Sequence, residues 1–236
     1  MTDGWIGFDA DDTLWHNESY FIETYELFAR LAAPYLGDHP DPSQAAHDLL
    51  IDTEITNIPS FGYGIKGATI SMIEAAITAS KGDISTIDIM ALIDRAKAMM
   101  AHPVEFLDGA LEALDAVSHR RLVLLTKGDL KDQHRKIDAS GLAERFDAIE
   151  ILHEKDETAY LRAFARLGVD PEHFVMIGNS LKSDVIPILG LGGWAVHVPY
   201  VTTWAIEYAD APVDHPRFRT SATLAGAAAI AEECLS

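Results

Sequence analysis

The stretch FDADDTL, residues 8–14, places three acids within four positions: Asp9, Asp11 and Asp12. It follows Trp5-Ile6-Gly7-Phe8, an apolar run that predicts a buried strand. Unit charges about 4 Å apart repel by roughly 4 kcal/mol at an effective dielectric constant near 20. The acids therefore predict that a cation is held close to the end of this strand.

Polar side chains also follow three later apolar runs that predict strands. They are Thr126, Lys127 and Gly128 after residues 122–125, Lys155 after residues 148–152, and Asn179 and Asp184 after residues 174–177. Ligands of open α/β sheets bind beyond the carboxyl ends of the strands, where these groups would meet. Carboxylate oxygens suit Mg²⁺, and a hydroxyl and an ammonium group can hold the other oxygens of a phosphoryl group.

The apolar runs alternate with helical patterns, which predicts an α/β, doubly wound fold with a parallel sheet covered on both faces. The predicted strands are residues 5–8, 122–125, 148–152, 174–177 and 194–198. The predicted core helices are residues 109–117, 130–139, 157–167 and 182–191, with a terminal helix after Thr220.

Residues 17–103 break this alternation, because they contain helical patterns and no convincing strand. Helices are predicted from Phe21 to Tyr35 and over residues 43–56, 69–80 and 86–100. So long a connection between two core strands indicates an inserted helical domain. The predicted organisation is a core of residues 1–16 and 104–236 and an inserted domain of residues 17–103.

Composition indicates which binding partners and which cellular locations are unfavourable for this protein. The 236 residues carry a formal net charge of −19, which disfavours nucleic acid and anionic membranes as partners. No run approaches a membrane helix, and the first residues lack the pattern of a secretory signal. The single cysteine, Cys234, cannot form an intramolecular disulfide. We therefore expect a cytoplasmic protein, either a monomer or a homodimer.

The ordered set of strand-end residues resembles the haloacid dehalogenase superfamily, in its Mg²⁺-dependent phosphatase branch. Asp9-Ala-Asp11-Asp-Thr13 is similar to the first motif of that family, Thr126 to the second, Lys155 to the third, and residues 178–184 to the fourth. The resemblance covers nearly the whole chain. It implies a Rossmann-like core, and it implies that the helical insertion is the family's cap.

The resemblance also implies a role for each residue. Asp9 would be the nucleophile that forms an aspartyl-phosphate, and Asp11 would be the general acid and base. Asp11 would need a pKa above its ordinary value to hold a proton at the first step. Mg²⁺ would be held by the Asp9 side chain, the Asp11 carbonyl and, in the fourth motif, Asn179 and Asp184. Thr126 with the following N–H groups, and Lys155, would bind the phosphoryl group.

Three details bear on specificity and on the metal. The first position of the fourth motif is Asn179, where such phosphatases usually have an acid, so the site loses one negative charge. Lys127 competes with Lys155 for the cation role, and its position favours Lys155. In the insertion, Tyr63 and Lys66 lie in the glycine-containing stretch 61–67, which either contacts the leaving group or only joins two helices.

Several residues near the first motif have structural alternatives. Asp12 is as compatible with a structural role as with a functional one, Thr13 would fix the turn, and Trp15 would pack. His16 is a further candidate for substrate contact. Ser180 and Ser183 would shape the loop of the fourth motif.

The predicted function is Mg²⁺-dependent hydrolysis of a small phosphorylated metabolite, a phosphate monoester. Three alternatives stay open: a phosphomutase, which would share every core motif, a 2-haloacid dehalogenase, which would use Asp9 to attack carbon, and a phosphometabolite-binding protein without turnover. Asp11 argues against the dehalogenase, because those enzymes lack the second acid and need no metal.

Overall fold

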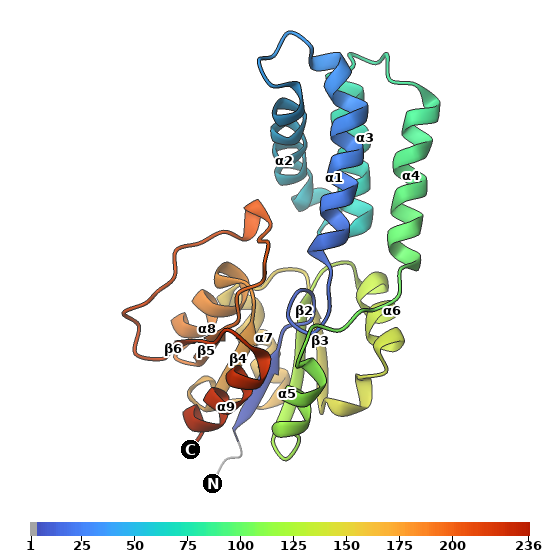
Figure 1. The fold of residues 1–236 in the computed structure, drawn as a ribbon. Coiled ribbons are helices and arrows are strands. Elements are labelled where there is room, and N and C mark those ends of the chain that lie inside the picture. The colour runs from blue at the N-terminus through green and yellow to red at the C-terminus, as the bar shows by residue number, and fades with distance from the viewer. Residues whose placement is uncertain (1–3) are drawn as a thin grey trace. The chain divides into compact units, whose positions relative to one another are not determined.

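The computed structural model describes residues 4–236, and its core is a sheet of six parallel strands in the order β3-β2-β1-β4-β5-β6 (Figure 1). The first three residues of the predicted core lie outside the described residues. The strands are β1 Trp5–Phe8, β2 Arg121–Lys127, β3 Ala148–Leu152, β4 Phe174–Gly178, β5 Trp194–His197 and β6 Phe218–Thr220. The α/β fold and the five strands predicted from the sequence are confirmed.

The sixth strand was missed by sequence reasoning. β6 is the short edge segment Phe-Arg-Thr, and its side chains are exposed or half-buried. It has no continuous apolar run, because an edge strand with one open side does not need one.

The centre of the sheet is β1, which pairs with β2 on one side and with β4 on the other. All four of its residues are buried, which explains why the run reads as continuously apolar. The chain passes from β1 outward through β2 to β3, then returns to β4 on the opposite side of β1. The strand order therefore reverses beside β1, where doubly wound sheets bind their ligands.

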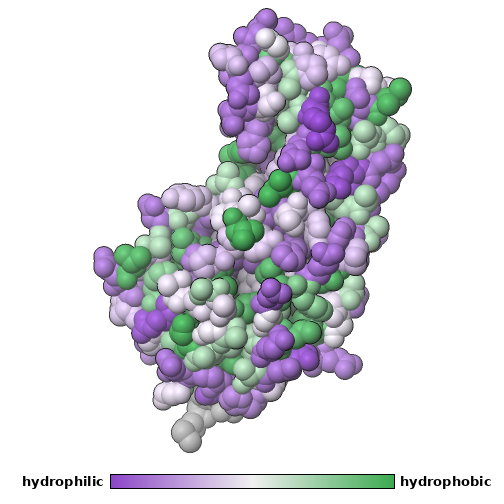
Figure 2. Space-filling model, in the orientation of Figure 1, coloured by the Kyte–Doolittle hydropathy of each residue, from purple (hydrophilic) through white to green (hydrophobic). Residues whose placement is uncertain are grey.

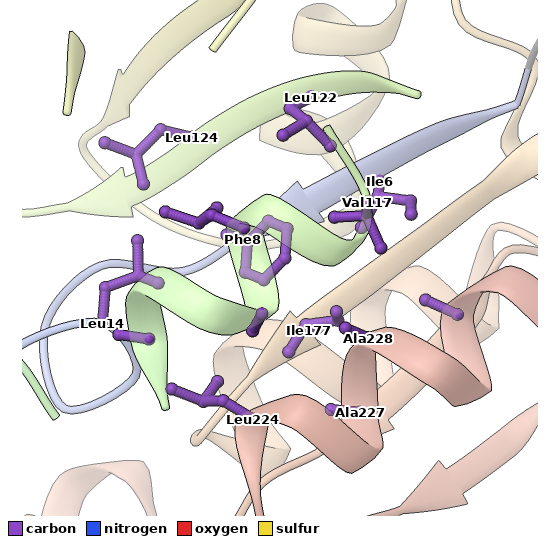
Figure 3. Packing of buried hydrophobic residues seen from close by; sticks show 14 of the residues in the cluster. Ile6, Phe8, Leu14, Val117, Leu122, Leu124, Ile177, Leu224, Ala227 and Ala228 are labelled. Carbon is purple, nitrogen blue, oxygen red and sulfur yellow. The ribbon is translucent and has the colours of Figure 1, made fainter. Parts of the chain in front are cut away.

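Helices cover both faces of the sheet. The helices of the core are α5 Ala110–Ala116, α6 Leu130–Ser140, α7 Glu157–Leu167, α8 Ile186–Gly190 and α9 Leu224–Cys234. In Figure 3, side chains from the segments around α5 and α9 pack against β1, β2 and β4. Ile137 of α6 belongs to the same cluster, whereas Phe164 of α7 and Ile188 of α8 belong to a second cluster with Val123 of β2.

The predicted helix at residues 182–191 is divided in two. Leu181–Val185 forms a π-helical turn, and α8 continues from it. Pro187 stands in the first turn of α8, where a missing N–H costs nothing. The wider turn overlaps the fourth motif, and π-helical turns are frequent at functional sites.

The insertion between β1 and β2 is helical, as predicted. It consists of α1 Glu18–Ala32, a 3₁₀ turn at Ala33–Leu36, α2 Pro42–Phe61, α3 Ile65–Ala79 and α4 Thr86–Ala101. Helix α4 begins where expected, because Ser85 Oγ accepts from the Asp88 N–H at 3.1 Å. Helix α2 ends at Phe61, five residues beyond the predicted end at Thr56.

The chain divides into two compact units. Unit 1 contains Val104–Ser236 and the described residues before Ser19, and unit 2 is Ser19–Pro103. Unit 2 has a buried apolar cluster of its own that includes Phe28, Leu50 and Met72. Each unit therefore buries a separate core.

The surface is largely hydrophilic on the face drawn in Figure 2, where hydrophobic side chains appear in small groups between polar ones. Within residues 4–236, no helix combines the length and the apolar character needed to cross a bilayer.

The packing of α7 against the sheet yields a stability prediction. Phe164 is 2% exposed and stacks near Phe174, whereas Leu161 on the same helix is 50% exposed. Phe164→Ala should lower the free energy of unfolding by about 3–5 kcal/mol, because it removes a buried ring and leaves a cavity. Leu161→Ala is the matched control and should change it by less than about 1 kcal/mol. Urea denaturation measures both, and equal losses would contradict the assignment of Phe164 to the core.

Candidate active site

A buried lysine joins two carboxylates at the carboxyl edge of the sheet. Lys155 Nζ donates to Asp9 Oδ1 at 2.5 Å and to Asp184 Oδ1 at 2.6 Å. The three residues are at most 6% exposed. They come from the segments after β3, β1 and β4, so the sheet gathers acids and a cation that lie far apart in sequence. Lys155 thus supplies a cation from the chain itself beside Asp9, in addition to the Mg²⁺ that the acid cluster predicts.

Burial and the mutual attraction and repulsion of these three side chains shift the pKa values of Asp9 and Lys155. Burial raises the pKa of Asp9 to about 7, against the attraction of Lys155 and with a further rise from Asp184. Burial alone would lower the pKa of Lys155, but Asp184 and Asp9 raise it well above its ordinary value. Lys155 therefore stays charged, while burial keeps the pKa of Asp9 above its ordinary value.

The hydroxyl of Thr13 lies between the first and fourth motifs. Thr13 Oγ1 is 3.0 Å from Asp9 Oδ2 and 3.3 Å from Asn179 Oδ1, and it accepts from the Asn179 N–H at 3.1 Å. A hydroxyl carries one hydrogen, so it can donate to only one of these two oxygens at a time. A carboxylate oxygen and an amide oxygen therefore converge on one small group.

Asp184 lies behind Lys155. One of its oxygens accepts from Lys155, and Oδ2 accepts from the Ser180 N–H at 3.0 Å. A Cβ on Gly178 would collide with this carboxylate, so the end of β4 must be glycine for Asp184 to fit. Both oxygens of Asp184 thus serve to hold the lysine and the loop of the fourth motif.

Asp11 faces a different set of donors. Its oxygens accept from Lys136 Nζ at 2.9 and 2.8 Å, from Gln133 Nε2 at 2.8 Å and from Trp15 Nε1 at 2.6 Å. Burial would raise the pKa of Asp11, but the charge of Lys136 and these hydrogen bonds hold it below its ordinary value. The predicted rise in the pKa of Asp11 is therefore wrong, because sequence reasoning did not place a lysine beside it.

Asp12 has a structural position. Its Oδ1 accepts from the N–H groups of Asn17 and Glu18 at 2.9 and 3.0 Å, where α1 begins. Its φ of +61° lies in the left-handed region that Asp and Asn tolerate. Burial raises the pKa of Asp12 to about 7.

The hydroxyl of Thr126 forms a hydrogen bond with a side chain of α6. Thr126 is 1% exposed, and its Oγ1 donates to Gln133 Oε1 at 3.2 Å. Gly128 has a φ of +149°, and a Cβ there would come within 2.9 Å of Gln133 Nε2. The positive φ favours glycine at this position, and a larger residue would also displace the amide of Gln133.

Lys127 is bound to acids of unit 1. Its Nζ donates to Glu207 Oε1 at 2.6 Å, to Ser183 Oγ at 3.0 Å and to Glu154 Oε1 at 3.2 Å. Glu207 also accepts from the hydroxyls of Ser180 and Ser183. Burial would raise the pKa of Glu207, but Lys127 and these hydrogen bonds lower it. Of the two candidate lysines, Lys155 is the one that the structure places on Asp9.

The sequence also matches a known protein family. A profile of the haloacid dehalogenase-like hydrolases matches residues 5–192, which include every strand end described above. The chain belongs to this family. It is an enzyme with the family's Rossmann-like core and a helical insertion after the first strand.

Solved structures agree with this assignment. A haloacid dehalogenase-like family hydrolase from Xanthomonas campestris is 37% identical over 98% of this chain and 91% of its own, with a TM-score of 0.85. The HAD-hydrolase YfnB from Bacillus subtilis, whose structure contains magnesium, shares the fold at 16% identity and a TM-score of 0.64, covering 98% of this chain and 99% of its own.

A curated relative matches over a shorter stretch. N-acylneuraminate-9-phosphatase from Mus musculus is 39% identical over 70 residues, which is 28% of this chain and 28% of the relative. This match is confined to about a quarter of each protein.

Two predicted substrate residues belong to unit 2. Tyr63 and Lys66 lie where α2 ends and α3 begins. Gly62 and Gly64 around them have φ values of +71° and +96°, so the expected unusual backbone angles are present. His16, the other candidate outside the motifs, has its Nδ1 2.7 Å from Tyr200 Oη in unit 1.

Sequence reasoning missed three side chains that bind those of the family motifs: Gln133, Lys136 and Glu207. A signal existed for the first two, because they stand one turn apart on the helix that Asp129 caps directly after the second motif. Glu207 gave no signal, since it lies in the long irregular segment between β5 and β6.

The atoms that could serve as ligands of a divalent metal ion at this site are oxygens. Among residues 4–236, no three His, Cys, Asp or Glu side chains are grouped to hold a metal ion. Asp9 Oδ2 and Asn179 Oδ1 converge on Thr13, and one carboxylate with one amide oxygen fits Mg²⁺, which takes its remaining ligands from water and substrate.

The buried carboxyl of Asp12 predicts a pH effect on stability. The native state holds a proton on Asp12 up to about pH 7, whereas the unfolded chain releases it near pH 4. The free energy of unfolding should therefore fall as pH rises between these values, by at most about 1.4 kcal/mol per unit from this group. Asp12→Asn keeps the acceptor oxygen and should remove that part of the slope. Urea denaturation in EDTA at pH 5 and pH 8 tests it, and parallel changes in both proteins would refute it.

Proposed function

We propose that this hydrolase is a Mg²⁺-dependent phosphatase that acts on small phosphate monoesters through an aspartyl-phosphate on Asp9. The observation that carries the proposal is the buried Asp9–Lys155 contact with a second carboxylate, Asp11, two residues further along the chain. A hydrolase that attacks carbon needs the first of these acids but has no use for a second that moves protons.

The first half-reaction transfers the phosphoryl group to Asp9. A carboxylate oxygen of Asp9 forms a bond to phosphorus, and the bond from phosphorus to the ester oxygen breaks. That oxygen takes a proton from the Asp11 carboxyl and leaves as an alcohol. Lys155 and the hydroxyl of Thr126 stabilise the charge on the phosphoryl oxygens. Asp11 must acquire its proton before this step, because its surroundings favour the charged form.

The second half-reaction restores the enzyme. A water oxygen bonds to phosphorus, Asp11 takes one proton from that water, and the bond between phosphorus and the Asp9 oxygen breaks. Inorganic phosphate leaves, and Asp9 returns to a carboxylate. The ionised Asp11, held by Lys136 and Gln133, suits this step as a base.

Magnesium would be held by Asp9, Asn179 and the carbonyl of Asp11, and it would neutralise charge on the phosphoryl group. Asp184 supports this site through Lys155 and Ser180. Lys127 and Gly128 shape the loop after β2, whose N–H groups would face the phosphate. Tyr63 and Lys66 remain candidates for contact with the leaving group.

One comparison supports a small phosphorylated substrate. The curated mouse relative is named for the 9-phosphate of a small molecule, N-acylneuraminate. The net charge of −19 opposes the approach of nucleic acid and of any other anion, so local cations such as Lys155 must bind the phosphate.

Phosphate release from a panel of small monoesters tests the proposal. Wild type should turn over at least one of them with Mg²⁺ and should lose activity in EDTA. Asp9→Asn should lower kcat by at least about 10³-fold, because it removes the nucleophile. Asp138→Asn, an exposed change on α6, is the matched control and should leave kcat unchanged.

Other outcomes would identify the alternatives. Halide release from a 2-haloacid without metal would favour a dehalogenase. Phosphate kept on an isomerised substrate would favour a mutase. Binding of Mg²⁺ and inorganic phosphate with no turnover of any ester would favour a binding protein.

Asn179 predicts a weak metal site. An amide oxygen carries no formal charge, and ligand charge sets much of the affinity for a hard cation. Asn179→Asp should therefore lower the Mg²⁺ concentration for half-maximal activity by roughly tenfold. Titration of activity with Mg²⁺ measures this. Identical activation constants in the two proteins would mean that position 179 does not bind the metal through its side chain.

A further inference from the structure

Two side chains of α6, Gln133 and Lys136, donate hydrogen bonds to the carboxylate of Asp11. Lys136 Nζ donates to both oxygens of Asp11 and to Asn17 Oδ1, each within 2.9 Å. An ammonium group has three hydrogens, so these contacts account for all of them. Lys136 therefore uses all its hydrogens to bind Asp11 and Asn17, which fixes the segment between them.

The surroundings make Lys136 the main counter-ion of Asp11. The lysine side chain is 9% exposed and that of Asp11 is 19% exposed, which limits screening by water. The nearest other acid is Asp132, whose Oδ2 lies 3.6 Å from Lys136 Nζ and whose Oδ1 accepts from Arg135. Asp132 thus has a cation of its own and competes weakly for the lysine.

Gln133 connects Asp11 to the phosphoryl-binding hydroxyl. Thr126 Oγ1 donates to Gln133 Oε1, which orients the amide so that Nε2 donates to Asp11 Oδ2. The hydroxyl of Thr126 has one hydrogen, which can go to Gln133 or to a phosphoryl oxygen but not to both. A phosphoryl group at Thr126 therefore takes away the contact that fixes the amide.

We propose that Lys136 and Gln133 are positioning residues for Asp11. We also propose that phosphoryl binding at Thr126 loosens the contact between Gln133 and Asp11. The inference rests on the proposed phosphatase function. Neither residue touches the reacting atoms. They act by fixing where the carboxyl group of Asp11 stands relative to the ester oxygen that it must protonate.

Two probes separate this role from a structural one. β-Glycerophosphate loses an alkoxide, which needs a proton from Asp11, whereas p-nitrophenyl phosphate loses a phenolate that leaves without one. The value of kcat/KM covers the steps through departure of the leaving group. A defect in the position of Asp11 should therefore lower kcat/KM for the first probe far more than for the second.

The variants are Lys136→Met and Gln133→Met, with Lys131→Met as the matched control, an exposed lysine on the same helix. Lys136→Met removes the charge that favours ionised Asp11 as well as the contacts that position it, and the loss of position should outweigh the easier protonation. It should therefore lower kcat/KM for β-glycerophosphate by about 30-fold or more, since a placed acid contributes about 10²–10⁴-fold. Gln133→Met should lower it by about tenfold, and both should lower kcat/KM for p-nitrophenyl phosphate by less than about threefold. Lys131→Met should change neither.

A double-variant cycle tests whether Lys136 acts through Asp11. In an Asp11→Asn background, Lys136→Met should cause no further loss with β-glycerophosphate. If Lys136→Met does not fold, as shown by thermal melting, Gln133→Met in the same two backgrounds gives the same test without removing a buried charge.

Each failure has its own pattern. Equal losses with both probes, or a full further loss in the Asp11→Asn background, would overturn the positioning role while leaving the phosphatase intact. Wild type that turns over neither probe nor any other monoester would overturn the proposed function and this inference together.

Discussion

The site depends on one buried ammonium group set between two carboxylates. Lys155 contacts both Asp9 and Asp184 in a region that admits almost no water. Removing either acid would leave the lysine with one partner, and removing the lysine would leave two like charges buried together, which costs several kcal/mol. Lys155 therefore allows Asp9 and Asp184 to be buried side by side, while Asp11 has a separate counter-ion in Lys136.

The topology of the sheet explains how these groups meet. β1 lies between β2 and β4, and every strand runs in the same direction, so the segments after them emerge at one edge. Each segment then contributes a different group: acids after β1, a hydroxyl at the end of β2, a lysine after β3 and an amide after β4. The chemistry of the edge is therefore divided among pieces of chain that are 24 (Lys155 to Asn179) to 170 (Asp9 to Asn179) residues apart.

Sequence reasoning succeeded where the signal was local. The buried strands are continuous apolar runs, and the strand-end residues could be named because an apolar run ends directly before each one. It failed for Lys136 and Gln133, since nothing near Asp11 in the sequence indicates a contact that spans more than 120 residues. The wrong prediction for the pKa of Asp11 has the same cause. β6 was missed because an exposed edge of three residues carries no pattern.

The order of the elements along the chain has a consequence for synthesis on the ribosome. β1 is made first, yet its two neighbours are Arg121–Lys127 and Phe174–Gly178, so the central strand stays unpaired until much of the chain exists. The helices of unit 2 are complete before β2 has been made, and they bury their own apolar cluster. Folding of these helices shortens the loop that β1 must close to find β2. The insertion can therefore fold as a compact spacer before β2 and β4 are available to pair with β1.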